Sequence, residues 1–100
     1  MTKHLKSTAE FDEAVSQGKV LVDFWATWCG PCMMMGERIA SELEPAHPEI
    51  TIVKVNVDEV PELAAKFGVM SIPTLICFNG GVKTREFVGV TSVSEIVAAF

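Results

Sequence analysis

The chain has 100 residues, 49% of them apolar, which suits one domain spanning residues 1–100 with one hydrophobic core. Its 13 acidic and 8 basic residues give a net charge of -5, and such a surface repels phosphate backbones, so we expect no nucleic-acid partner. No apolar run approaches the roughly 18 residues of a membrane span, so we expect no membrane partner either.

The first quarter of the chain predicts a weak strand, a short helix and a buried strand. Residues 3–6 are the weak strand. Ser7 and Glu10 have the spacing of a capping box, and the helix that they begin should stop at Gly18. Residues 19–25, with sequence KVLVDFW, are an almost continuous apolar run, which is typical of a strand buried on both faces of a parallel sheet.

The middle of the chain predicts two helices around another strand. Pro31 is a favoured first-turn residue, so a second helix should begin near it and end before Pro45. The apolar stripe of this helix consists of Cys32, Met35, Ile39 and Leu43. Residues 50–57, with sequence ITIVKVNV, predict a strand, and Pro61 begins a short helix that should stop at Gly68.

The last part of the chain predicts a hairpin and a helix. Residues 74–78 and 85–90 are strand-like and flank Asn79-Gly80-Gly81, which predicts an antiparallel hairpin with a loop longer than two residues. Ser92 and Glu95 cap a last helix. The order β-α-β-α-β-α-β-β-α predicts an α/β fold, a central mixed sheet of about five strands with about four helices on its two faces.

Cys29 and Cys32 lie at a predicted strand-to-helix junction, with Gly30 and Pro31 between them. Residues three apart on a helix share a face, at a separation that a disulfide accepts. Such a bridge closes a very short loop and constrains the unfolded chain little, so a purely structural disulfide explains the pair poorly. Amide groups and the macrodipole at a helix N-terminus stabilise a thiolate, which favours Cys29 as nucleophile and Cys32 as its shielded partner.

A metal site is the alternative use of the pair. One Cys-x-x-Cys supplies two ligands, whereas a structural zinc site usually needs four. The other candidate ligands are scattered over three predicted elements: His4, His47 and Cys77. We therefore expect no metal, and we interpret Cys77, in the middle of an apolar strand, as an unreactive core thiol.

Three segments carry a family resemblance. Residues 20–32, 69–74 and 87–89, with sequences VLVDFWATWCGPC, VMSIPT and FVG, resemble the thioredoxin family, and essentially the whole chain follows that family's element order. The resemblance implies the thioredoxin fold and a redox-active Cys29–Cys32 disulfide. It also implies a protein-disulfide reductase, an electron carrier that acts by dithiol–disulfide exchange and helps to maintain cell redox homeostasis.

The same resemblance implies the partners. The oxidised pair would be reduced by a thioredoxin reductase, a flavoprotein that uses NADPH, so NADPH would act indirectly and no cofactor would bind to this chain. Substrates would be disulfide-containing proteins such as peroxiredoxins or reductases, and we expect a monomer. The odd, small number of cysteines, and the lack of an apolar segment after the basic start of residues 1–6, predict a reducing, cytoplasmic location.

In the mechanism that the resemblance implies, Cys29 attacks the substrate disulfide and Cys32 resolves the mixed disulfide. Gly30 lets the loop approach the partner closely, and Pro31 fixes the start of the helix. The resemblance further implies a cis bond before Pro73. The substrate would lie in a groove formed by Trp28, Ile72, Pro73 and Gly89.

Asp23 interrupts the apolar run of residues 19–25, and a buried carboxylate without a partner is costly when it is charged. It is either a structural partner of Lys54, on the next predicted strand, or a functional base. The resemblance implies that it accepts the proton of Cys32 and that Lys54 tunes it. Burial should raise the pKa of Asp23 towards neutrality, as such a base requires, and we favour this interpretation.

Two places depart from the family pattern. Met33 follows the second cysteine, where thioredoxins usually carry Lys or Arg, so a positive charge near the thiols is missing. Gly36-Glu37 occupies the region where the family usually has a helix-kinking proline. Two other classes of function stay open, a binding module without redox activity and an oxidase or isomerase of an oxidising compartment. The intact cysteine pair argues against the first class and its Gly-Pro centre against the second.

Overall fold

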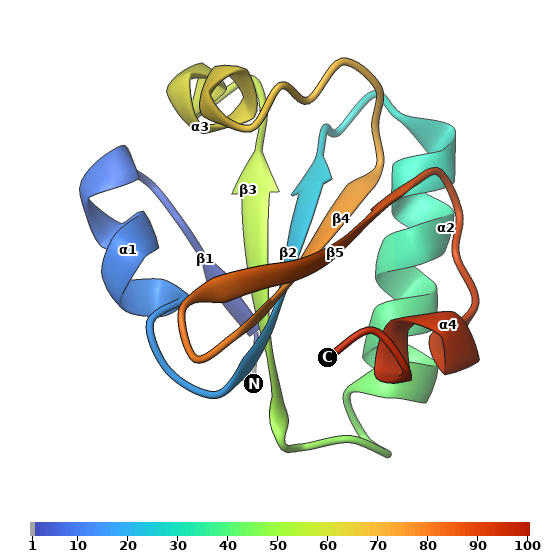
Figure 1. The fold of residues 1–100 in the computed structure, drawn as a ribbon. Coiled ribbons are helices and arrows are strands. Elements are labelled where there is room, and N and C mark those ends of the chain that lie inside the picture. Colours follow the sequence, from blue (N-terminus) through green and yellow to red (C-terminus); the bar gives the residue numbers. More distant parts are fainter. Residues whose placement is uncertain (1) are drawn as a thin grey trace.

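The computed structural model describes residues 2–100 as a mixed five-stranded sheet with helices on both faces (Figure 1). The strands lie in the order β1-β3-β2-β4-β5, with bounds β1 (Thr2–His4), β2 (Lys19–Trp25), β3 (Ile50–Asn56), β4 (Thr74–Asn79) and β5 (Val82–Val88). β1 and β2 pair in parallel with β3, whereas β4 joins β2 and β5 in antiparallel fashion. This is the predicted arrangement, and the weak first strand is present in a shorter form.

The helices cover the sheet in pairs. Their bounds are α1 (Phe11–Ala14), α2 (Gly30–Arg38), α3 (Pro61–Lys66) and α4 (Val93–Val97). A 3-10 turn, Thr8–Glu10, precedes α1. α1 and α3 pack on one face of the sheet, and α2 and α4 pack on the other (Figure 1).

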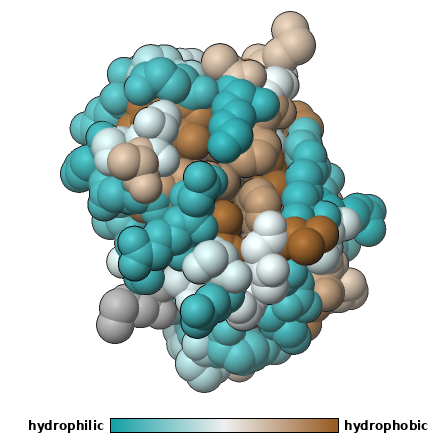
Figure 2. Space-filling model, turned by 60° about the vertical axis from the view of Figure 1, so that its left-hand side comes forward, coloured by the Kyte–Doolittle hydropathy of each residue, from teal (hydrophilic) through white to brown (hydrophobic). Residues whose placement is uncertain are grey.

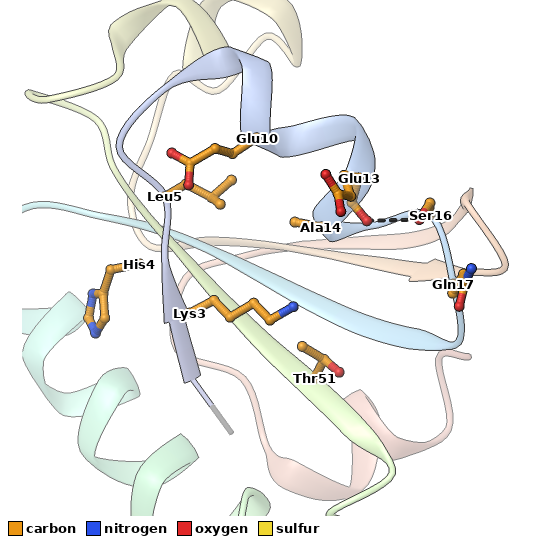
Figure 3. Close-up of a pocket in the computed structure, with 9 residues that line it drawn as sticks. All are labelled: Lys3, His4, Leu5, Glu10, Glu13, Ala14, Ser16, Gln17 and Thr51. Atoms are coloured by element: carbon orange, nitrogen blue, oxygen red, sulfur yellow. Dashed lines mark hydrogen bonds between the residues drawn. The ribbon is translucent and has the colours of Figure 1, made fainter.

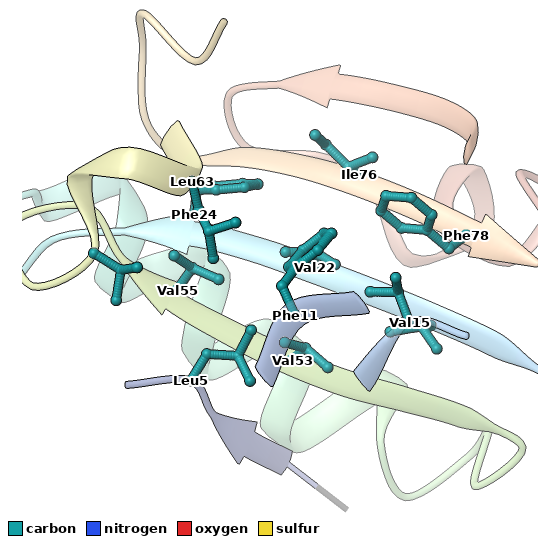
Figure 4. Close-up of a cluster of buried hydrophobic side chains, with 12 residues drawn as sticks. Leu5, Phe11, Val15, Val22, Phe24, Val53, Val55, Leu63, Ile76 and Phe78 are labelled. Carbon is teal, nitrogen blue, oxygen red and sulfur yellow. The ribbon is translucent and has the colours of Figure 1, made fainter. Parts of the chain in front are cut away.

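β2 contributes to the core on both sides of the sheet. Its residues Val20, Val22 and Phe24 belong to the cluster beneath α1 and α3. Figure 4 shows this cluster, in which side chains from the helices and the strands point toward one another. Leu21 belongs to the second cluster, beneath α2 and α4. Because side chains alternate along a strand, Asp23 lies on the same face as Leu21, under α2.

The second helix begins beside Pro31, as predicted, and runs unbroken past Gly36 to Arg38. It then widens into a π-helical turn, Ile39–Leu43, closed by the bond from Glu44 N to Ile39 O (2.8 Å). The departure from the family pattern at Gly36-Glu37 therefore does not end the helix. The wider turn lies after it, and the predicted stripe still packs on the sheet.

The hairpin differs from the prediction. The turn between β4 and β5 has two residues, Gly80 and Gly81, rather than a longer loop, and β5 begins at Val82, earlier than expected. Both glycines have positive φ, 60° and 85°, which is the combination that a tight hairpin turn requires. A register shift between Cys77 and Phe78 accommodates the longer β5.

The two predicted capping boxes have different outcomes. The one at Ser7 is wrong, because Ser7 Oγ donates to Glu10 Oε1 (3.2 Å) and caps no backbone N–H. The chain enters α1 through a 3-10 turn, and the Glu10 carboxylate accepts from Lys6 N (3.1 Å) rather than from Ser7 N. At α4, Ser92 Oγ accepts from Glu95 N (3.3 Å) and Glu95 Oε2 accepts from Ser92 N (3.3 Å), so this capping box is confirmed.

Replacing Ser92 tests the contribution of this cap. Ser92→Ala removes the acceptor for Glu95 N, and we expect it to lower the free energy of unfolding by about 1 kcal/mol. Ser7→Ala is the matched control, and it should cost less than about 0.5 kcal/mol because its hydroxyl caps nothing. Urea melts measure both changes. Equal losses in the two variants would contradict the assignment.

Candidate active site

The cysteine pair lies where the chain passes from β2 into α2. Cys29 is the N-cap residue of α2, and Cys32 lies in the first turn of the helix. The two residues form a disulfide, with their Cα atoms 5.2 Å apart. Gly30 and Pro31 begin the helix between them. The predicted pairing is therefore present, at the predicted junction.

The Cys29 sulfur lies at the positive end of the helix and is the more accessible of the two. Cys29 is 6% exposed and Cys32 is 1% exposed. Cys29 Sγ accepts a hydrogen bond from Cys32 N (3.2 Å), while Pro31 has no N–H to offer. This amide and the macrodipole of α2 both favour negative charge on Cys29 when the disulfide is open.

Trp28 lies beside the disulfide in a fixed orientation. Its side chain is 70% exposed, and its Nε1 donates to Asp58 Oδ2 (2.8 Å) in the loop after β3. Asp58 N donates in turn to Asn56 Oδ1 (2.8 Å), which holds this loop against the end of β3. The sequence analysis missed Asp58. Its position just after β3 could have indicated it. Trp25 and Asn56 pair, so β2 and β3 end side by side and the loops that follow them lie close together.

The segment before β4 approaches the disulfide from another part of the chain. The Ile72-Pro73 peptide bond is cis, as the family resemblance implies. Ile72 O lies 3.7 Å from Cys29 Sγ, and Pro73 O accepts a hydrogen bond from Gly89 N (2.8 Å). Gly89 has a φ of 93°, a region that other residues rarely adopt. The structure thus places Ile72 against Cys29, with Pro73 and Gly89 directly behind it.

Asp23 is completely buried under α2. Burial raises its pKa from 3.8 to about 6, and the Lys54 ammonium opposes this with a smaller lowering. Lys54 Nζ lies 3.9 Å from Asp23 Oδ2 and 4.4 Å from the centre of the Trp25 ring. Within residues 2–100 neither carboxylate oxygen has a hydrogen-bond partner. The structure brings Asp23 and Lys54 together as expected, and a carboxyl with this pKa can exchange a proton near neutral pH.

Cys77 and His47 lie apart from this site. Cys77 is fully buried in β4, and burial raises its pKa to about 11 against a smaller opposing effect of Arg85. His47 Nδ1 lies 3.2 Å from Glu49 Oε2, at the surface. In the part of the chain that the structure describes, no three His, Cys, Asp or Glu side chains gather as metal ligands would.

A hollow of about 520 Å³ lies between β1, α1 and the start of β3, and Figure 3 shows the residues that line it. Figure 2 shows the side of the molecule that carries α1, where hydrophilic atoms surround smaller apolar patches. The lining residues Gln17 and Thr51 lie before β2 and at the start of β3, whereas Cys29 follows the end of β2. The hollow is therefore separate from the cysteine site.

The family's usual cation after the second cysteine has no counterpart here. Met33 occupies that position on α2 and is 43% exposed. Its thioether carries no charge, so the Cys32 amide and the helix dipole act on Cys29 without help from this side chain.

None of the helices within residues 2–100 has both the length and the apolar character needed to cross a membrane.

Comparison with known sequences gives a consistent result. The family model described as Thioredoxin matches residues 2–100. A thioredoxin from Alicyclobacillus acidocaldarius subsp. acidocaldarius is 47% identical over 91 residues, which cover 90% of this chain and 87% of that protein. A thioredoxin from Staphylococcus aureus (strain Mu50 / ATCC 700699) is 50% identical over 84 residues, covering 81% of this chain and 78% of that protein.

Solved structures extend the likeness to the fold. The oxidised form of mitochondrial thioredoxin 3 from Saccharomyces cerevisiae has a TM-score of 0.89 at 30% identity, covering 98% of this chain and 92% of that chain. A chain from work on the thiol resolving mechanism in yeast mitochondrial 1-Cys peroxiredoxin via glutathione/thioredoxin systems has a TM-score of 0.89 at 29% identity, with the same coverage. The likeness therefore includes almost the entire chain in both sequence and fold.

Asp23→Asn tests the effect of burial on stability. Asp23 has a pKa near 3.9 in an unfolded chain and about 6 in the fold. Well below pH 4 both states are protonated, so the shift has no effect there. As the pH rises through 6, the unfolded chain ionises more readily, and the protein should lose up to about 3 kcal/mol of stability.

The Asn variant lacks this titration, so its stability relative to the parent should increase between about pH 4 and pH 8, as urea melts can measure. The double variant Asp23→Asn/Lys54→Met controls for the ammonium that the single variant leaves without its carboxylate. A difference between variant and parent that does not change with pH would contradict the raised pKa.

Cys77 should react far more slowly than Cys29. Alkylation needs access and a thiolate, and burial denies Cys77 both. In the reduced native protein at neutral pH, we expect Cys29 to be labelled at least ~100-fold faster, as mass spectrometry of the peptides can measure. Comparable rates would mean that β4 opens readily in the native state.

Proposed function

The chain belongs to the thioredoxin family, and we propose a reaction in which Cys29 attacks a substrate disulfide and Cys32 then releases the reduced product. The protein is a disulfide reductase that acts by dithiol–disulfide exchange and helps to maintain cell redox homeostasis. Its Cys29–Cys32 pair carries two electrons in each cycle. The observation that carries this function is the disulfide itself, formed at the N-terminus of α2 with Cys29 on the accessible side.

The first step joins the two proteins. The Cys29 thiolate attacks one sulfur of the substrate disulfide, so a Cys29–substrate bond forms and the substrate S–S bond breaks. The departing substrate thiolate takes a proton from solvent. The Cys32 amide and the macrodipole of α2 support this step, because both stabilise the attacking thiolate.

The second step releases the product. Cys32 gives its proton to Asp23 and attacks Cys29 Sγ. The Cys29–Cys32 bond forms, the Cys29–substrate bond breaks, and the second substrate thiolate takes a proton from solvent. The pKa of Asp23, about 6, supports its role as acceptor, because an ordinary aspartate holds a proton too weakly at neutral pH. Lys54 tunes this group through its charge.

The substrate lies against the cis-proline segment and Trp28. The backbone of Ile72 borders Cys29 Sγ, so an extended substrate strand placed there presents its disulfide to the nucleophile. Gly89 supports Pro73 and leaves open space where a side chain would project. The exposed, oriented ring of Trp28 offers an apolar contact next to the sulfur.

A flavoprotein thioredoxin reductase returns the pair to the dithiol with electrons from NADPH, so this chain binds no cofactor of its own. Its substrates are disulfide-containing proteins, with peroxiredoxins among them. The similarity to a chain studied with yeast mitochondrial 1-Cys peroxiredoxin supports this choice. We place the reaction in a reducing, cytoplasmic compartment, in keeping with the free thiol of Cys77.

Cysteine variants test the two roles. Cys29→Ser should abolish the reduction of insulin, because no nucleophile remains. Cys32→Ser should form a stable mixed disulfide with the substrate, because the second step is lost. Gel electrophoresis without reductant, followed by mass spectrometry, detects the adduct. Cys77→Ala is the control and should turn over at the parental rate. Turnover by Cys29→Ser, or trapping through any cysteine other than Cys29, would contradict the assignment.

A further inference from the structure

Gly36 lies within α2 at a point where the helix faces a charged group. Glycine is among the least favourable residues in a helix interior, because it loses the most backbone freedom on folding. A Cβ atom at this position would lie 3.3 Å from Lys54 Nζ, closer than such atoms ordinarily approach. The helix therefore carries an unfavourable residue where a side chain would press on the ammonium.

The Lys54 ammonium is confined by its neighbours. On β2, Asp23 Oδ2 lies 3.9 Å from Nζ and the centre of the Trp25 ring lies 4.4 Å away. On α2, Gly36 lies next to it, and the Lys54 side chain is 19% exposed. The separation between the ammonium and the carboxylate thus depends on the room that Gly36 leaves.

A cavity of about 270 Å³ adjoins these groups and extends to the edge strand, where Thr2 and His4 line it. β1 and β2 pair with opposite edges of β3, the strand that carries Lys54. The end of the cavity at β1 therefore lies on one side of Lys54, and Asp23 lies on the other. Figure 3 shows the His4 ring turned away from α1 and toward α2. Asp23 and Gly36 line the cavity as well. The end of the Lys54 side chain therefore has room to shift toward β1, and a shift in that direction increases its distance from Asp23.

We infer that Gly36 is a positioning residue for the reductase reaction, because by lacking a side chain it keeps the Lys54 ammonium beside the Asp23 carboxylate. The inference rests on the proposed role of Asp23 as the acceptor of the Cys32 proton. The ammonium favours the ionised carboxylate and so offsets part of the effect of burial. Without it, Asp23 would retain its proton to higher pH and would be a poorer acceptor at neutral pH.

Few other charges face Asp23. His4 lines the same cavity from β1, and Cys32 of α2 titrates only when the disulfide is open. The residues that face Asp23 from β4 and line the cavity from α2 and its π-helical turn are uncharged: Leu75, Gly36, Ile39 and Ala40. In the oxidised protein, therefore, Lys54 is the charged side chain that acts on the titration of Asp23.

Gly36→Ala in the oxidised protein tests the inference. Carbon NMR of the Asp23 carboxyl should show its pKa raised by about half to one pH unit. In the reduced form, the rate of insulin reduction near pH 6 should fall about threefold and stay at the parental value near pH 9, where thiols ionise without help. An unchanged or lowered pKa of Asp23 would overturn the inference.

Lys54→Met provides the matched background. Removing the ammonium should by itself raise the pKa of Asp23, and adding Gly36→Ala should then shift it no further. An equal shift in both backgrounds would overturn the inference, because the added methyl group would then act through the helix or through desolvation. The same titrations report whether each variant is folded, since a buried carboxyl loses its raised pKa on unfolding.

The NMR and kinetic measurements separate the two proposals. If the pKa of Asp23 rises in Gly36→Ala and the pH profile of reduction moves with it, both proposals are supported. If the pKa rises and the profile does not move, Asp23 is not the acceptor, and the link from Gly36 to catalysis falls with it. If the pKa does not rise, Gly36 has no positioning role, whereas the role of Asp23 is untouched.

Discussion

The burial of one carboxylate in the central strand governs the chemistry of this fold. Asp23 lies among apolar neighbours of the sheet, and loss of hydration there raises its pKa to about 6. In water the same group would bind a proton only near pH 4 and below, whereas here it titrates close to neutral pH. Lys54 moderates this effect without forming a tight ion pair, since 3.9 Å separates its Nζ from Asp23 Oδ2. The core thus contains an unfavourable group that titrates near neutral pH.

The same strand determines where the sulfur lies. The chain leaves β2 and reaches α2 through a short loop in which Ala26 is fully buried, and Cys29 follows as the N-cap. Met35 and Ile39 hold the helix on the sheet by packing into the cluster beneath it. Because such a core is close-packed, packing holds α2, with the two thiols at its start, over the face of β2 that carries Asp23. Stability and reactivity therefore depend on the same contacts.

Much of the fold can be predicted because its signals are local. The run of residues 19–25 is apolar on both faces and becomes β2 with the predicted bounds. Identical spacings are less informative, because Ser92 caps α4 whereas Ser7, at the same spacing from a glutamate, caps no backbone N–H. The pair Gly80-Gly81 permits both a two-residue turn and a longer loop, and only strand pairing decides between them. These errors arise where local sequence allows two conformations and the tertiary structure selects one.

The features of the site also fall into those that the sequence predicts and those that only the tertiary structure shows. Cys29, Cys32 and the cis bond before Pro73 follow from short motifs and the family that they resemble. The bond between Trp28 and Asp58, and the contact that a side chain at Gly36 would make, depend on how a loop and a helix lie over the sheet. A glycine offers no functional group to interpret, so its meaning comes from whatever occupies the space that it leaves. Here that is the Lys54 ammonium beside the buried Asp23 carboxyl, a setting that the letter at position 36 does not reveal.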